Sequence, residues 1–251
     1  MRIYGLIGER LGHSFSKRYF EKKFADEKRF DCRYELFELP SIDQLGHLLE
    51  AMPDLSGFNV TIPYKQAILP LLDEIDVEAA RVGAVNTVCV TRTSGKTKLS
   101  GFNTDVEGFR CSMAGMPLPA RALVLGTGGA AAAVTFVLNQ WNVPFQQVSR
   151  HPHNDQLAYS SLTPKLIADH PFIINCTPVG MFPLVDVKPE IPYDYVSTEH
   201  FLYDLIYNPL ETKFLQEGKS RGARTQNGLR MLHLQAEASW RIWNGDPVLT
   251  Q

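Results

Sequence analysis

The stretch Arg121-Ala122-Leu123-Val124-Leu125-Gly126-Thr127-Gly128-Gly129-Ala130-Ala131 contains three structural signals in direct succession. Residues 121–125 are typical of a buried strand, the glycines predict a tight turn, and residues 132–137 predict the start of a helix. In a dinucleotide-binding unit, glycines in this arrangement let the backbone approach a pyrophosphate at the helix N-terminus. Three glycines alone would also fit an ordinary turn, but their position between a strand and a helix favours nucleotide binding.

The next predicted strand, Phe145 to Ser149, bears on the choice of dinucleotide. An NAD-binding unit carries Asp or Glu about twenty residues after the first glycine, where it binds the ribose 2′-hydroxyl. Here the window ends in Ser149-Arg150 without an acid, and Arg150 is placed to meet a 2′-phosphate. We therefore expect NADP, while Asp155 keeps a ribose contact and NAD open. His151 and His153 are interpreted as loop residues and not as a metal site, because no third ligand lies near them in the sequence.

Two more strands of this unit are predicted at Phe172–Asn175 and Phe201–Ile206. They precede the loops Cys176–Met181 and Tyr207-Asn208-Pro209. Ligands of parallel α/β sheets bind at the carboxyl ends of the strands, so we expect both loops at the ligand-binding edge.

The residues before the expected linker, Gly115–Pro119, alternate between strand and helix signals. Strands are predicted at Ile3–Ile7, at Tyr34–Leu39 and around Asn59, with helices between them, which favours a largely parallel sheet covered by helices. Residues 85–90 and 98–102 then predict a hairpin around Thr93-Ser94-Gly95. The fold class is therefore α/β.

The stretch Asn59-Val60-Thr61-Ile62-Pro63-Tyr64-Lys65 carries the strongest catalytic hypothesis. Val60 and Ile62 alternate with polar residues, which predicts a strand with one apolar face, and Pro63 fits the first turn of a helix. An amide, a hydroxyl and the Lys65 ammonium would then converge, as an enzyme needs in order to hold a polyhydroxylated substrate and move a proton. The alternative is an edge strand with a solvated polar face.

Five other polar positions have both a structural and a functional interpretation. Ser14 and Ser16 precede a predicted helix, where Ser16 would cap the helix or both hydroxyls would hold a carboxylate. Asp105 either caps the following helix, as Thr104 would, or pairs with Lys65. Asn86 and Gln235 either satisfy local structure or bind hydroxyl groups.

Composition narrows the class of protein. The chain has 251 residues, 44% of them hydrophobic and 21% charged, with a formal net charge of −2, which disfavours nucleic-acid binding. No apolar run reaches membrane-spanning length, and no signal-peptide pattern precedes the first predicted strand. The four cysteines are far apart, so we expect reduced thiols in a cytoplasmic protein.

Together, these residues resemble the shikimate dehydrogenase family. The matching pieces, in chain order, are Gly12–Ser16, Asn59–Lys65, Gly83–Thr87, Gly101–Asp105, Gly126–Ala130, Asn175–Met181, Asp204–Pro209 and Asn227-Gly228-Leu229 leading to Gln235. The resemblance implies a mixed α/β substrate domain (1–105 and 227–251), an inserted Rossmann-like NADP-binding domain (106–226), and an active site in the cleft between them. It implies reversible NADPH-dependent reduction of 3-dehydroshikimate to shikimate in aromatic amino-acid (chorismate) biosynthesis, by a monomer or homodimer.

The resemblance also implies individual roles. Lys65 would be the general acid/base, with Asp105 as its partner. The substrate carboxylate would be bound by Ser14 and Ser16. The remaining substrate contacts would come from Thr61, Asn86, Asp105, Gln235 and Tyr207, and the cofactor contacts from Gly126, Thr127, Gly128, Gly129, Ala130, Arg150, Leu205 and Gly228.

The sequence departs from the family pattern at three places. Lys17 replaces a usual proline, Arg230 replaces a usual glycine, and the loop at Arg150 lacks a usual Asn and a second Arg, which weakens the expected preference for NADP. Two alternatives therefore stay open. One is a quinate/shikimate dehydrogenase that uses NAD, and the other is a catalytically silent sensor of pathway metabolites, against which the presence of both Lys65 and Asp105 argues.

Overall fold

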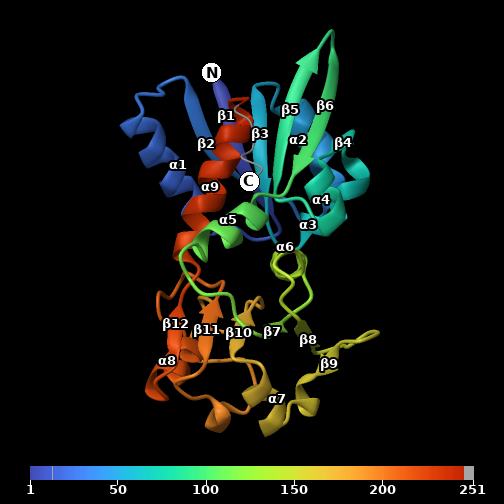
Figure 1. Ribbon diagram of the computed structural model, residues 1–251. Helices are drawn as coiled ribbons and strands as arrows, with labels where there is room; N and C mark the ends of the chain where they lie inside the picture. Colours follow the sequence, from blue (N-terminus) through green and yellow to red (C-terminus); the bar gives the residue numbers. More distant parts are fainter. Residues whose placement is uncertain (13, 246–251) are drawn as a thin grey trace. The chain divides into compact units, whose positions relative to one another are not determined.

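The computed structural model describes residues 1–12 and 14–245, which form two compact units (Figure 1). The first unit comprises Met1–Thr104 and Ala236–Gln251, and the second comprises Asp105–Gln235. His13, quoted for the resemblance, and residues 246–251 of the expected substrate domain lie outside the described residues.

A six-stranded sheet with the order β2-β1-β3-β5-β6-β4 forms the centre of the first unit. β1 is parallel to β2 and β3, whereas β5 is antiparallel to β3 and β6. The predicted hairpin is confirmed, and so is the parallel pairing of the three strands before it, while the antiparallel pairs of β5 make the whole sheet mixed. The strands are β1 (Arg2–Gly8), β2 (Cys32–Glu38), β3 (Leu55–Val60), β4 (Glu74–Ile75), β5 (Thr87–Thr93) and β6 (Lys96–Phe102).

Both faces of this sheet are covered because β1 is apolar on both sides. Ile3 and Ile7 belong to one buried cluster, and Tyr4 and Leu6 to another. The first cluster includes residues of α2, α3 and α4, and the second includes residues of α1 and α9 (Figure 1). The helical segments are α1 (Phe15–Asp26), η1 (Ile42–Gln44), α2 (Leu45–Ala51), α3 (Tyr64–Ala67), η2 (Leu69–Leu71), α4 (Val77–Val82) and α9 (Leu229–Trp243), of which the residues from Ala236 onward belong to this unit.

The end of β3 corrects one prediction. The strand stops at Val60, and the side chain of Ile62 is 61% exposed, so Ile62 does not continue the apolar face. Thr61 accepts a hydrogen bond from the Tyr64 amide (2.9 Å), which turns the chain immediately. The predicted helix start is confirmed, since Pro63 directly precedes α3 and Lys65 is the second residue of this helix.

The second unit contains a parallel sheet with the order β12-β11-β10-β7-β8-β9. The chain builds outward from β7 in one direction and then from β10 in the other, which makes the β7–β10 boundary the topological switch point. Its strands are β7 (Ala122–Leu125), β8 (Phe145–Ser149), β9 (Leu157–Ala158), β10 (Phe172–Asn175), β11 (Phe201–Asp204) and β12 (Arg224–Gln226). Its helical segments are α5 (Thr104–Ser112), which begins at the unit boundary, α6 (Gly129–Gln140), η3 (Tyr159–Ser161), α7 (Pro164–Asp169), η4 (Tyr193–Tyr195) and α8 (Lys213–Ser220).

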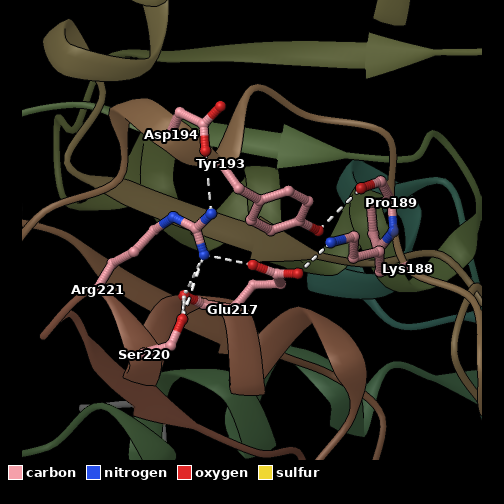
Figure 2. A network of polar contacts seen from close by, with 7 residues as sticks. All are labelled: Lys188, Pro189, Tyr193, Asp194, Glu217, Ser220 and Arg221. Carbon is pink, nitrogen blue, oxygen red and sulfur yellow. Dashed lines mark hydrogen bonds and ion pairs between the residues drawn. The ribbon is translucent and has the colours of Figure 1, made fainter.

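The long connection from β10 to β11 is fastened to α8 by charged side chains. Figure 2 shows Glu217 of α8 between Lys188 and Arg221, both of which it pairs with. The Lys188 ammonium lies 4.5 Å from the centre of the Tyr193 ring, and the Tyr193 hydroxyl donates to the Pro189 carbonyl oxygen at 2.8 Å (Figure 2). These contacts hold the connection against the outer helix of the sheet.

One glycine of β3 permits the docking of α9 in the first unit. A Cβ atom on Gly57 would lie 2.4 Å from Nε1 of Trp243, and this nitrogen donates to the Val88 carbonyl oxygen at 3.0 Å. We expect Gly57→Ala to lower the free energy of unfolding by about 1–3 kcal/mol, because the added methyl displaces the indole. Urea unfolding measures the change.

A matched control is Gly46→Ala in α2, where a Cβ atom meets nothing within 4 Å. That variant should keep or raise stability, since alanine favours a helix by up to about 1 kcal/mol over glycine. Equal midpoints for the two variants would contradict the packing role of Gly57.

Candidate active site

Five predicted site residues belong to the first unit, and backbone hydrogen bonds bring three of them to the end of β3. The Thr61 amide donates to Ile7 of β1 (2.9 Å), and the Val60 amide donates to Asn86 (2.9 Å). The Val85 amide donates to the carbonyl oxygen of Lys65 (2.7 Å). The backbones of Thr61, Lys65 and Asn86 are thus held together at the carboxyl end of β3. The sequence predicted this position for Thr61 and Lys65.

The other two residues, Ser14 and Ser16, lie at the start of α1. Ser14, and not Ser16, is the N-cap, and its hydroxyl accepts a hydrogen bond from the Ser16 amide at 3.2 Å. Ser16 is already inside the first turn, because the helix starts at Phe15. Both hydroxyls therefore lie at the positive end of a 12-residue helix, an environment that suits a carboxylate.

A buried amide, that of Asn59, links β2 and β3 to the segment before β5. The hydroxyl of Tyr34 in β2 donates to Oδ1 of Asn59 at 2.8 Å. Burial raises the pKa of Tyr34 well above its usual value, so this hydroxyl stays protonated and able to donate. Nδ2 of Asn59 donates to the Asn86 carbonyl oxygen at 3.2 Å.

The same Asn59 amide nitrogen reaches two hydroxyl-bearing residues from separate elements, and a third completes the cluster. It lies 3.1 Å from Thr87 Oγ1 in β5 and 2.9 Å from Ser239 Oγ in α9. Thr87 and Ser239 are 2.8 Å apart, and Thr104 of α5 lies 3.1 Å from Thr87 and 3.2 Å from Ser239. All three hydroxyl-bearing residues are buried.

Tyr34, Thr87 and Ser239 were not predicted as part of the site. Their one signal in the sequence is the presence of polar residues in otherwise apolar strand and helix patterns.

Asn86 connects this network to the helix that carries Asp105. Its Oδ1 accepts from the Thr104 amide at 2.7 Å and from the Thr104 hydroxyl at 3.1 Å. The buried amide therefore does satisfy local structure, and a substrate contact would fall to its Nδ2 group. Because α5 begins at Thr104, neither Thr104 nor Asp105 is the N-cap that the sequence favoured.

Ser239 offers a test of the network. Ser239→Ala removes the hydroxyl shared by Asn59, Thr87 and Thr104 and leaves buried polar groups with fewer partners. We expect a loss of about 1–3 kcal/mol in the free energy of unfolding, measured with urea. Ser100→Ala is the matched control, since that hydroxyl makes a long 3.4 Å contact to Glu74 near the surface, and a similar loss in both variants would argue against the network.

Three predicted substrate residues belong to the second unit. Asp105 is buried in the first turn of α5, where the helix N-terminus favours a negative charge. Nε2 of Gln235 donates to the Leu232 carbonyl oxygen at 2.9 Å, and Tyr207 is half-buried in the loop after β11. The pairing of Asp105 with Lys65 and the substrate contacts of Gln235 and Tyr207 stay predictions.

The glycine turn of the second unit has the geometry that a dinucleotide needs. Gly126 has a φ of +108°, and a Cβ atom there would lie 3.0 Å from Cγ2 of Thr177. Gly128 precedes α6 as its N-cap, and a Cβ atom there would meet nothing within 4 Å. An open surface with backbone N–H groups at a helix start fits a pyrophosphate. The turn, formed with Thr127, Gly129 and Ala130, lies at the switch point, beside the loop after β10.

Arg150 lies directly after β8 with an exposed side chain. The turn around it is fixed by Ser149, whose hydroxyl accepts from the His151 amide at 3.1 Å. Asp155 is exposed, and its backbone oxygen accepts from the Gln146 side chain at 2.5 Å. A guanidinium in this place suits a 2′-phosphate, as the sequence predicted, and the ribose contact of Asp155 stays a prediction.

Leu205 and Gly228 are direct neighbours. A Cβ atom on Gly228 would lie 2.0 Å from the Leu205 carbonyl oxygen, and the Gly228 amide donates to the Ile206 carbonyl oxygen at 2.9 Å. Only glycine fits at position 228. The backbones of the two predicted cofactor residues therefore lie against each other at the end of β11.

Asp204, the last residue of β11, is a buried acid for which no individual role was predicted from the sequence. Its carboxyl group accepts hydrogen bonds from the side-chain Nδ2 of Asn175 (3.0 Å), the backbone N–H of Ile206 (3.0 Å) and the hydroxyl of Thr212 (2.5 Å). None of the ion pairs among residues 1–12 and 14–245 involves it. Burial therefore raises the pKa of Asp204 from 3.8 to about 7, although the three hydrogen bonds oppose the rise.

The raised pKa of Asp204 predicts a pH dependence of stability. Between its unfolded value of 3.8 and about 7 the folded state binds more protons, so the free energy of unfolding should fall as pH rises through this range. A shift of this size corresponds to at most about 4 kcal/mol. In Asp204→Asn, which does not titrate, this part of the decline should be absent, and parallel urea profiles between about pH 4 and about pH 8 would contradict the shift.

Two negative findings apply to the described residues. Within residues 1–12 and 14–245, no group of three or more His, Cys, Asp or Glu side chains is arranged to hold a metal ion. In the same residues, none of the helices has both the length and the apolar character needed to cross a membrane.

The chain is similar to known proteins over its whole length. Residues 6–88 match the shikimate dehydrogenase substrate binding domain. A relative from Clostridium beijerinckii named shikimate dehydrogenase (NADP(+)) is 37% identical over 266 residues, covering 100% of this chain and 96% of the relative. The chain belongs to the shikimate dehydrogenase family.

Solved structures agree with this assignment. Shikimate dehydrogenase from Thermus thermophilus, in complex with NADP(H) and shikimate, is 32% identical with a TM-score of 0.84, covering 98% of this chain and 94% of that chain. Quinate dehydrogenase from Corynebacterium glutamicum, in complex with NAD, is 28% identical with a TM-score of 0.83. The match covers 97% of this chain and 94% of that chain. The predicted family and its two α/β domains, one mixed and one Rossmann-like, are confirmed.

Proposed function

We propose that this chain is an NADP-dependent oxidoreductase that interconverts 3-dehydroshikimate and shikimate. The observation that carries the proposal is the joining of Thr61, Lys65 and Asn86 at one sheet edge, in a chain whose full-length relatives are named NADP(+) shikimate dehydrogenases. The predicted activity and cofactor agree with those names. The product serves chorismate and aromatic amino-acid biosynthesis.

The residues present can perform the proton transfer of this reaction. When bound to the second unit, NADPH would supply a hydride for the carbonyl carbon, so negative charge would develop on the carbonyl oxygen. The Lys65 ammonium stabilises that charge and donates the proton, and Asp105 keeps the ammonium oriented. In the reverse direction, the neutral amine of Lys65 accepts the hydroxyl proton.

Substrate recognition follows from the polar groups of both units. Ser14 and Ser16 bind the carboxylate at the start of α1. Thr61, Asn86, Asp105 and Gln235 bind ring hydroxyl groups, and Tyr207 contacts the substrate.

The cofactor is bound by the second unit in this proposal. The turn from Gly126 to Ala130 binds the pyrophosphate, Arg150 binds the 2′-phosphate, and the Leu205–Gly228 backbone contacts the nicotinamide end. The substrate-binding domain is residues 1–105 with 227–251, and the NADP-binding domain is residues 106–226.

The finer points on state and location belong to the same proposal. The free cysteines, Cys32, Cys89, Cys111 and Cys176, agree with a reducing, cytoplasmic location. A monomer or homodimer stays the expected assembly.

One specific observation supports a second candidate activity. Arg150 is alone in the predicted phosphate-binding loop, and quinate dehydrogenase with NAD is among the similar structures. A quinate and shikimate dehydrogenase that uses NAD is therefore the alternative. The silent sensor has weaker support, because a sensor needs neither a proton donor nor its partner.

Lys65→Ala tests the proposed reaction. We expect kcat to fall by about 10²–10⁴-fold, since the general acid is lost, while shikimate still binds with a similar Kd. The measurement is NADPH formation with shikimate, together with calorimetric titration of shikimate into the variant.

The matched control is Lys96→Ala, at the tip of the β5–β6 hairpin, which should keep full activity. The same assay with NAD and with quinate separates the two candidate dehydrogenases. An unchanged kcat in Lys65→Ala would refute the role of Lys65, and absence of any turnover in the wild type would refute the activity itself.

A further inference from the structure

Asp204 contacts both strand ends that follow the switch point. Asn175 ends β10, and its Nδ2 group donates to Oδ1 of Asp204 at 3.0 Å. The Ile206 amide, in the loop after β11, donates to the same oxygen at 3.0 Å. One carboxyl oxygen therefore bridges the two strand ends.

From Asn175, hydrogen bonds continue through the loop after β10. Its Oδ1 accepts from the Thr177 amide at 3.1 Å and from the Thr177 hydroxyl at 2.6 Å. The Thr177 hydroxyl oxygen accepts from the Val179 amide at 3.2 Å, and Nδ2 of Asn175 donates to the Val179 carbonyl oxygen at 3.3 Å. The conformation of residues 176–179 thus depends on the orientation of Asn175, which Asp204 fixes.

The second carboxyl oxygen of Asp204 and the loop after β11 are also held. Oδ2 accepts from the Thr212 hydroxyl at 2.5 Å, and Thr212 is the N-cap of α8. The amides of Leu205 and Gly228 donate to Asn175 and Ile206 at 3.0 and 2.9 Å, which places the Leu205–Gly228 backbone beside the same carboxyl group. The Phe182 amide joins the two loops directly through the Asn208 carbonyl oxygen (3.1 Å).

The loops after β10 and β11 lie on one side of the switch point in the sheet of the second unit. The glycine turn follows β7 and Arg150 follows β8, so the adenosine end of a dinucleotide belongs to the β7–β8 side. The loops after β10 and β11 then flank the other mononucleotide, on the opposite side of the switch point.

We infer that Asp204 is a positioning residue for the cofactor: it sets the two loops after β10 and β11 in the conformation that receives the nicotinamide end of NADP(H). This role rests on the proposed function. Asp204 acts through Asn175, Ile206 and Thr212, and its own side chain is fully buried.

The surroundings of Asp204 support a neutral carboxyl group as well as an ionised one. The titratable groups that interact with it are the thiol of Cys176 and the hydroxyl of Tyr193, and burial raises the pKa of both. Neither provides a cation. A protonated Oδ2 can donate to Thr212 while Oδ1 still accepts from Asn175 and Ile206, so asparagine can reproduce every bond.

The test compares Asp204→Ala, Asp204→Asn and the control Asp194→Asn, an exposed acid of the same unit. NADPH binding is measured by fluorescence titration, and shikimate kinetics at saturating NADP. We expect Asp204→Ala to raise the Kd for NADPH at least about tenfold while the KM for shikimate stays within about twofold. Asp204→Asn and Asp194→Asn should bind like the wild type.

Hydrogen exchange provides a readout that does not depend on activity. In Asp204→Ala the amides of Thr177, Val179 and Ile206 should lose protection, whereas amides of β7 keep it, and Asp204→Asn should restore it. If Asp204→Ala does not fold, Thr212→Val removes a single donor to the carboxyl group and should still weaken NADPH binding several-fold.

Two outcomes separate the failures. Wild-type NADPH affinity with unchanged loop exchange in Asp204→Ala, or in Thr212→Val where Asp204→Ala does not fold, would overturn the inference while leaving the proposed function intact. A wild type that binds neither NADPH nor NADH would refute the proposed function.

Discussion

The first unit of this protein depends on one buried carboxamide. Asn59 is the residue through which β3, β5 and α9 share hydrogen bonds, and it also accepts a hydrogen bond from Tyr34 of β2. A buried amide without partners would cost several kcal/mol, so loss of any member of the network destabilises the unit. Asn86, which is proposed to bind substrate, is held by this network through its carbonyl oxygen.

In the second unit, a buried carboxyl group has the corresponding role. A carboxyl group with no cationic partner among the described residues holds the loops after β10 and β11, and burial makes its ionisation unfavourable. Such a group lowers stability near neutral pH, and perturbed acids of this kind gather at functional sites. The two units thus share a principle, since in each a buried polar side chain fixes the backbone next to residues that are proposed to bind a ligand.

Local sequence signals predicted much of the fold. The glycine turn, the parallel strands of the second unit and the β5–β6 hairpin each depend on neighbouring residues, and each is present. Ile62 was placed wrongly because apolar alternation continues in the sequence for one residue beyond the point where Thr61 turns the chain. Ser16 was chosen as the cap over Ser14 because both residue types fit, and only the helix start at Phe15 distinguishes them.

Contacts between distant residues could not be predicted in the same way. Ser239 is 180 positions from Asn59, and nothing in its own neighbourhood indicates a partner. Asp204 was predicted to lie inside the strand Phe201–Ile206 and had no predicted role of its own, because its carboxyl group is held by Asn175 of β10 and by Thr212, the N-cap of α8. For the site, the residue types at Lys65, Asn86 and Arg150 were informative by themselves, whereas the groups that position them are a product of tertiary structure.

The return of α9 to the first unit has a consequence for synthesis on the ribosome. The aromatic cluster of the first sheet contains Trp240 and Trp243, so residues 1–104 emerge long before the side chains that complete their core. The second unit, residues 105–235, is translated in one uninterrupted segment and can fold before the first unit has received its last helix. Nascent chains should therefore expose the Tyr4 and Phe20 surface until α9 has left the ribosome and can pack on it.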